Sequence, residues 1–209
     1  MSVGTYLLHL LLGFTLSFIG SLPIGMINMT VAETTIRKGM KAGLIIALGA
    51  SLVELLQALV AIKFSSIFTS NPDIGQFIQW IAVPILLGLG LYYLTRKEKP
   101  QQQSPETPEK AAKLPQFSKG LFISALNVLA IPYWIFYGSY LRAEGWLMTN
   151  SSLLIFATGV MLGTFVLLWL YARLSLAIVS KVQRIAHFTN QFIGIIMLLF
   201  GIFQLIRVL

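Results

Sequence analysis

Residues 20–29 read GSLPIGMINM and interrupt an apolar run that begins near Tyr6 and meets no cluster of charges before Arg37 and Lys38. That run is too long for one straight bilayer crossing, which needs about 20 residues. A proline such as Pro23 removes a backbone donor and clashes with the preceding turn, and glycines permit unusual backbone shapes. A helix broken inside a bilayer is tolerated only where protein or a polar cavity satisfies the freed backbone groups. The stretch therefore predicts a broken helix at a binding site, and a simple proline kink is the alternative.

The composition is that of a membrane protein. Of 209 residues, 56% are hydrophobic and 11% are charged, whereas soluble domains carry about 25% charged residues. The net charge of +8 falls in predicted loops, where a bias of cations toward the cytoplasm explains it without a nucleic-acid partner. The chain has no cysteine, which excludes disulfides, thiolate metal sites and dithiol redox chemistry. No lysine or arginine precedes the first apolar run, so we expect a retained span rather than a cleavable signal peptide.

The apolar pattern predicts an all-α polytopic membrane protein with six transmembrane helices. The predicted spans are 5–35, 40–62, 75–94, 117–141, 152–171 and 188–208. The polar segment 95–116 is rich in Pro, Gln, Glu and Lys, cannot bury a core, and is predicted to be a flexible linker. Residues 172–187 alternate apolar and basic side chains at helical spacing, which suits a short helix at the membrane surface.

The basic residues orient the spans. Twelve of the fifteen lysines and arginines fall within 37–41, 96–119 and 173–184, and the other three are Lys63, Arg142 and Arg207. Cytoplasmic loops carry an excess of cations, so the larger group is placed in the cytoplasm. Both termini then face outward, and the linker is cytoplasmic.

The two halves of the chain share features in the same order. Pro23 in the first span corresponds to Pro132 in the fourth, and both lie about 20 Å from the cytoplasmic boundary. An Ala-x-Gly triplet follows each proline, ending at Gly49 and Gly159. A three-span unit has an odd number of crossings, so its copy is inverted, and we expect two inverted three-helix repeats with the first and fourth helices interrupted at proline. The predicted domains are the first repeat (1–94), the linker (95–116) and the second repeat (117–209).

Glu54 is the one acid predicted deep within a span, thirteen residues after Lys41. A carboxylate at that depth is costly and normally functional. It can bind an ammonium group or another cation, or it can carry a proton for coupled transport. The alternative is a structural pairing with Gln57 or a serine that locks helices together.

Other polar and aromatic residues accompany the two prolines. The amides of Asn28 and Asn127 either hold freed backbone groups or contact substrate, and Tyr133 either lines a pocket or packs between helices. His9 and His187 are the only histidines and fall near opposite faces of the membrane, so no histidine metal pair is expected. The sequence has no nucleotide-binding loop, Ser–His pair or metal-ligand cluster, so we expect no cofactor, no resident metal and no enzymatic activity.

Residues 23–56 resemble the N-terminal signature of the lysine-exporter (LysE/RhtB-type) translocators. Members have a Pro-Ile-Gly-Pro element, then a basic-Gly-x-x-Ala-Gly turn, then a glycine-containing helix with an acid. The matching residues here are Pro23-Ile24-Gly25-Met26, Lys38-Gly39-Met40-Lys41-Ala42-Gly43, and Gly49 with Glu54. An Asn-Pro-like element that opens the family's fourth span is similar to Asn127 and Pro132. Met26 replaces the family's second proline, Asn127 and Pro132 are not adjacent, and Glu54 stands where Asp is commoner.

The resemblance implies export of amino acids or related small metabolites across a bacterial inner membrane, driven by the proton gradient. The amides of Ile24–Ile27 would hold a carboxylate, because helix N-termini attract anions, and Glu54 would face the ammonium group or relay a proton. The predicted substrate-binding residues are Pro23, Ile24, Gly25, Met26, Asn28, Glu54, Asn127, Pro132 and Tyr133. The alternatives are a metal-cation exporter of the same superfamily and a non-transporting membrane accessory protein. The expected partners are a small-molecule substrate and the lipid bilayer, without nucleic acid, and self-association into a homo-oligomer is left open.

Overall fold

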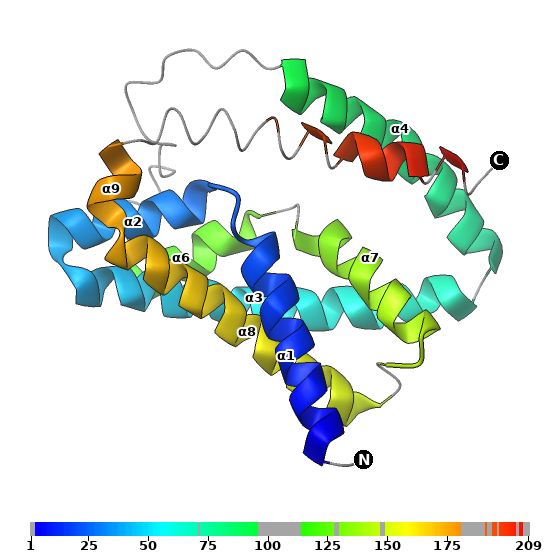
Figure 1. The fold of residues 1–209 in the computed structure, drawn as a ribbon, viewed down its shortest axis with the longest axis horizontal. Coiled ribbons are helices and arrows are strands. Elements are labelled where there is room, and N and C mark those ends of the chain that lie inside the picture. Colours follow the sequence, from blue (N-terminus) through cyan, green and yellow to red (C-terminus); the bar gives the residue numbers. More distant parts are fainter. Residues whose placement is uncertain are drawn as a thin grey trace. The chain divides into compact units, whose positions relative to one another are not determined.

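A computed structural model describes residues 3–70, 72–95, 114–127, 130–146 and 149–180, together with 191, 194–195, 197–203 and 205–206. Every regular element within these ranges is a helix (Figure 1). The helices are α1 (Val3–Gly20), α2 (Met26–Lys38), α3 (Met40–Ser70), α4 (Pro72–Thr95), α6 (Gln116–Ala125), α7 (Ala130–Ala143), α8 (Asn150–Arg173) and α9 (Ser175–Ser180). The all-helical class predicted from the sequence is confirmed for the described residues.

The described helices include clear membrane spans. Met40–Ser65 of α3 and Asn150–Arg173 of α8 have mean hydropathies of 2.2 and 2.3 and are long enough to cross a bilayer. The pair α6 and α7 counts as a third span if the two pieces, inclined by 66°, are taken together. The chain is therefore a helical membrane protein with several spans. The predicted linker falls largely outside the described residues. The predicted sixth span is described in part, at 191, 194–195, 197–203 and 205–206, and the predicted surface helix at 172–180, which includes α9.

The first span is broken where Pro23 predicts. Helix α1 ends at Gly20, and α2 begins at Met26 after the non-helical residues 21–25. Gly25, the N-cap of α2, has an extended backbone with φ of −122° and ψ of 179°. Pro23 cannot donate a backbone hydrogen bond, so the helix cannot continue unbroken through it.

The second break is displaced from its predicted position. Helix α6 ends at Ala125 and α7 begins at Ala130, so Pro132 is the third residue of α7 and the interruption comes before it. The expectation of a break at this proline is corrected accordingly. The first residues of a helix have no intrahelical partner for their N–H groups, so a proline there removes no hydrogen bond.

The helices divide into two compact units, each with its own packing. One contains α1, α2, most of α3 and α6–α9, and the other contains α4 and the helical residues described between 191 and 206. In the second unit, Gly90 of α4 lies close to Leu198, since a Cβ added to Gly90 would lie 2.8 Å from the Leu198 side chain. All the predicted site residues belong to the first unit.

Within the first unit, α1 lies along α8, from the other half of the sequence (Figure 1). The backbones touch through glycines: a Cβ on Gly13 would collide with the carbonyl oxygen of Phe156, and one on Gly159 with that of Leu10. Close approach through small residues is the usual way in which membrane helices gain packing energy.

Helices α3 and α6 make the corresponding contact. A Cβ on Gly49 would collide with the carbonyl oxygen of Phe117, and one on Gly120 with that of Ile46. Each of the two helices that precede a break, α1 and α6, is thus held against a long helix of the opposite half of the chain.

Candidate functional site

The first break is held by side chains rather than frayed. Asn28, buried in the first turn of α2, donates from Nδ2 to the carbonyl oxygens of Ser21 at 2.9 Å and Pro23 at 3.1 Å. The Tyr171 hydroxyl of α8 donates to the carbonyl oxygen of Leu22 at 2.8 Å. Three successive carbonyl groups freed by the break are therefore satisfied, as burial in a membrane requires. The Asn28 amide therefore holds the backbone of the break, which is one of the two roles predicted for it, and its contact with substrate stays a prediction.

The N-terminus of α2 offers backbone donors at this break. Gly25 provides no side-chain cap, and the ladder of helical hydrogen bonds begins with the Met29 amide on the Gly25 carbonyl at 3.1 Å. The amides of Met26, Ile27 and Asn28 precede that ladder and point out of the helix end. Such an end carries a partial positive charge and suits an anion such as a carboxylate.

Glu54 lies on α3 with 8% of its surface exposed and is bonded to an unexpected partner. Its Oε1 accepts a hydrogen bond from the indole Nε1 of Trp134 on α7 at 3.0 Å. Trp134 is fully buried and packs edge-on against Phe156, with ring centroids 5.9 Å apart. The sequence suggested Gln57 or a serine as a structural partner and missed Trp134, although a buried tryptophan normally finds an acceptor for its N–H.

The second break is joined to α3 by Gln57 and Ser124. Gln57 Nε2 lies 3.4 Å from the carbonyl oxygen of Ser124 and 3.5 Å from that of Asn127, and it donates to both. The Ser124 hydroxyl donates to the carbonyl oxygen of Ala50 at 3.2 Å. Asn127 is therefore bonded through its backbone carbonyl group, and the residue is exposed. Pro132 is also exposed, on the first turn of α7.

Tyr133 connects the surroundings of the two breaks. Its hydroxyl donates to the carbonyl oxygen of Leu16 on α1 at 2.7 Å, and a Cβ on Gly20 would lie 2.8 Å from its ring. Its ring packs edge-on against Trp134, with centroids 4.9 Å apart. Tyr133 therefore touches both the helix that leads into the first break and the residue that holds Glu54. The structure brings Glu54, Gln57, Trp134 and Tyr133 together on α3 and α7. Asn28 and Tyr171 hold the first break, which Tyr133 approaches through Leu16 and Gly20 of α1.

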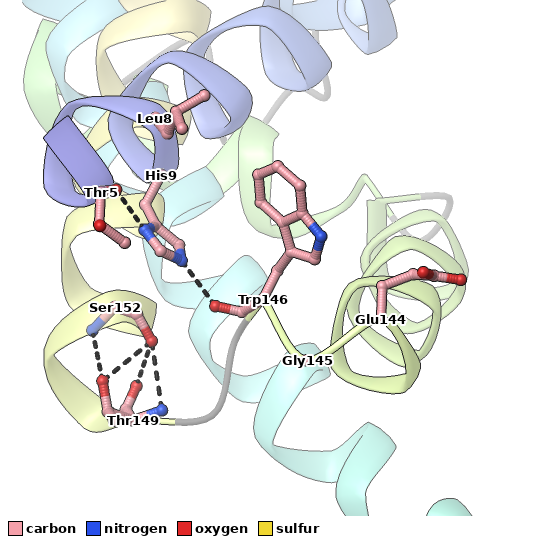
Figure 2. Close-up of a pocket in the computed structure, with 8 residues that line it drawn as sticks. All are labelled: Thr5, Leu8, His9, Glu144, Gly145, Trp146, Thr149 and Ser152. Atoms are coloured by element: carbon pink, nitrogen blue, oxygen red, sulfur yellow. Dashed lines mark hydrogen bonds between the residues drawn. The ribbon is translucent and has the colours of Figure 1, made fainter. Parts of the chain in front are cut away.

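An open pocket of about 480 Å³ lies at the other end of α1 (Figure 2). Buried His9 bridges Thr5 and Trp146 there: Nδ1 lies 2.6 Å from the Thr5 carbonyl oxygen and Nε2 lies 2.6 Å from that of Trp146. Figure 2 also shows the mutual hydrogen bonds of Thr149 and Ser152 that cap α8. None of the predicted site residues lines this pocket, so it stands apart from the candidate site.

A family model decides the class of protein. Residues 18–207 match the model described as LysE type translocator. The chain belongs to this family. The LysE-type match covers both breaks, Glu54, and the residues around them, and it confirms the resemblance read from residues 23–56. LysE-type translocators are transporters, so this chain is a multi-pass membrane protein that exports small molecules.

A curated relative points the same way. The LysE-type chain is 27% identical over 168 residues to a protein of Bacillus subtilis (strain 168) named "Putative amino acid efflux protein YcgF", covering 80% of this chain and 77% of the relative. No solved structure matches the chain. Among the described residues, no group of three or more His, Cys, Asp or Glu side chains is placed to hold a metal ion.

Proposed function

We propose that this LysE-type translocator exports amino acids across the bacterial inner membrane, and that the substrate binds between the two breaks. The observation that carries the proposal is that one helical unit contains both a cluster of hydrogen-bond donors and a buried acid. The uncapped N-terminus of α2 presents backbone donors, and Glu54 presents a buried carboxylate. A zwitterion needs both, a donor cluster for its carboxylate and an acid for its ammonium group.

The inverted repeat belongs to the same proposal, and two glycine–serine pairs support it. Gly13-x-x-x-Ser17 lies in α1 and Gly120-x-x-x-Ser124 in α6, each ahead of a break. Each glycine touches the long helix of the opposite half, α8 for the first and α3 for the second. A pseudo-two-fold axis generates such an exchange, and inverted repeats of this kind are built around a transport site at mid-membrane.

The serines extend the correspondence to hydrogen bonds. Matching Gly49 to Gly159 makes Ala50 equivalent to Val160 and Glu54 equivalent to Thr164. Ser124 donates to the carbonyl oxygen of Ala50. Ser17 bonds to Thr164 at 2.6 Å, and Thr164 donates to the carbonyl oxygen of Val160. Only one half carries the acid, so the site is asymmetric, as an asymmetric zwitterion requires.

In the proposed cycle the two halves rock about the occupied site and expose it to the cytoplasm and the outside in turn. Glu54 exchanges a proton for the substrate ammonium group and so couples export to the proton gradient. In this proposal the linker 95–116 lies in the cytoplasm and both termini lie outside, which the uneven distribution of basic residues supports.

Counterflow of labelled amino acids in proteoliposomes tests this function. The wild-type protein is expected to exchange at least one amino acid of the twenty, with an efflux rate that rises with an imposed proton gradient. Glu54→Gln should lower proton-driven efflux by about tenfold or more, because it removes the charge that faces the substrate.

Glu144→Gln is the matched control, since Glu144 is an exposed acid at the end of α7 and should tolerate the same change. If Glu54→Gln keeps proton-driven efflux, the coupling role is wrong. If it also binds substrate as the wild type does, Glu54 is structural.

A further inference from the structure

The Gln57 side chain bonds to the second break, and the orientation of its amide group follows from its two hydrogen-bond partners. It lies on α3, three residues after Glu54, and its side chain reaches the carbonyl oxygens of Ser124 and Asn127. Both partners are acceptors only, so the amide must turn its NH₂ group toward them. Oε1 then faces away from the break.

This oxygen is buried, and within the described part of the chain it has no hydrogen-bond partner. Buried amide oxygens almost always accept a hydrogen bond, and an exception calls for an explanation. Rotation of the amide does not help, because it would set Oε1 against the two carbonyl oxygens of the break.

The groups around Gln57 are rich in acceptors. Glu54 lies one turn back on the same side of α3, because residues three apart on a helix are neighbours. The carbonyl oxygens of Ser124 and Asn127 lie at the C-terminal end of α6, where the helix dipole is negative. These groups lack a hydrogen-bond donor for the Gln57 oxygen, and together they favour a positively charged ligand.

We propose that Oε1 of Gln57 is a ligand for the substrate ammonium group beside Glu54, and that Gln57 sets the selectivity for that group. The inference rests on the proposed amino-acid export. An ammonium group has three donors, so it can bond to Glu54 and Gln57 together. A hydroxyl group has one donor and no charge, so it satisfies this pair poorly. The Gln57 NH₂ group bonds to the carbonyl oxygens of the second break. A substrate bound at Oε1 would therefore also affect the geometry of that break in the fourth span.

The test compares an amino acid with its 2-hydroxy-acid analogue, which has a hydroxyl in place of the ammonium group. Both are measured as competitors of counterflow in proteoliposomes, using an amino acid that the wild-type protein exchanges. The ratio of the two inhibition constants does not depend on how much protein is folded. The wild type should favour the amino acid, and Gln57→Met should lower this preference by about ten- to a hundredfold.

Gln116→Met, at the start of α6, makes the same chemical change away from the site and should keep the wild-type preference. Gln57→Glu keeps an acceptor but sets a carboxylate against the break, so it should retain the preference while exchange slows. This second variant keeps the proposal testable if Gln57→Met fails to fold, because loss of the preference in Gln57→Glu contradicts it.

The possible outcomes distinguish a failure of the proposed role of Gln57 from a failure of the proposed amino-acid export. If Gln57→Met exchanges amino acids with an unchanged preference, Gln57 is a structural residue and the inference is wrong, while amino-acid export stands. If the wild type exchanges no amino acid, the proposed function fails and this inference fails with it.

Discussion

At the scale of single residues, the Glu54–Trp134 bond is the contact that most constrains a mechanism. It joins residues eighty positions apart and places a carboxylate among fully buried aromatic side chains. A carboxylate in such surroundings is stable only while its hydrogen bonds are intact. Trp134 therefore fixes the position of the Glu54 side chain, which the proposed function assigns to the substrate or a proton. Tyr133 packs on Trp134 and bonds to Leu16, so it links this pair to α1.

Trp134→Phe should separate the hydrogen bond from the packing, because the aromatic bulk stays while the N–H donor is lost. We expect the free energy of unfolding in detergent to fall by about 1–3 kcal/mol, since Glu54 loses a buried hydrogen bond. In a double-mutant cycle with Glu54→Gln, the two losses should be less than additive. Additive losses would mean that the two residues act independently.

At the scale of helices, the two breaks differ in how they are built. The first contains its proline and is braced by Asn28 and Tyr171. The second precedes its proline and is braced by Gln57. In both, a side chain from a long helix, α8 or α3, reaches the freed carbonyl oxygens. A movement of either long helix against its neighbour would therefore change the geometry of a break.

Gly159→Ala tests the glycine contact that allows α1 and α8 to pack closely. The added Cβ would meet the Leu10 carbonyl oxygen, so α1 must shift away from α8. We expect the protein to be destabilised by about 1–3 kcal/mol, as overpacking usually costs, with exchange slowed. The measurement is thermal unfolding in detergent, paired with counterflow.

Gly88→Ala is the control for this substitution, because nothing lies within 4 Å of its added Cβ. Alanine favours a helix more than glycine does, so this change should leave stability unchanged or raise it by up to about 1 kcal/mol. Equal effects at Gly88 and Gly159 would show that close contact between α1 and α8 is not what the glycine provides.

At the scale of the whole molecule, the distribution of charge predicts how the chain lies in the membrane. The absence of cysteine makes a direct test simple, since each introduced cysteine is the only one. In intact cells a membrane-impermeant maleimide should label Glu144→Cys, and it should label Ser104→Cys only after the membrane is permeabilised. The opposite pattern would invert the proposed topology and place both termini in the cytoplasm.

The local features of the candidate site could be predicted from the sequence. A break at Pro23 follows from the chemistry of one residue, and the structure confirms it. The depth of Glu54 in the membrane comes from counting residues along a helix and stays a prediction. The second break could not be placed in the same way. A proline forbids a helix only beyond the first turn, so Pro132 was compatible with a break at it or just before it. The structure settles this in favour of a start at Ala130.

By itself the sequence determined the membrane class, the helical character, the break at Pro23, the candidate acid Glu54 and the LysE-type family, because these depend on composition and on neighbours along the chain. Only the tertiary structure decided that Trp134 holds Glu54, that Gln57 braces the second break and that Tyr171 reaches the first. Those partners are distant in sequence. They meet because glycines let α1 lie on α8 and α6 lie on α3, and which backbones approach so closely depends on the packing of whole helices.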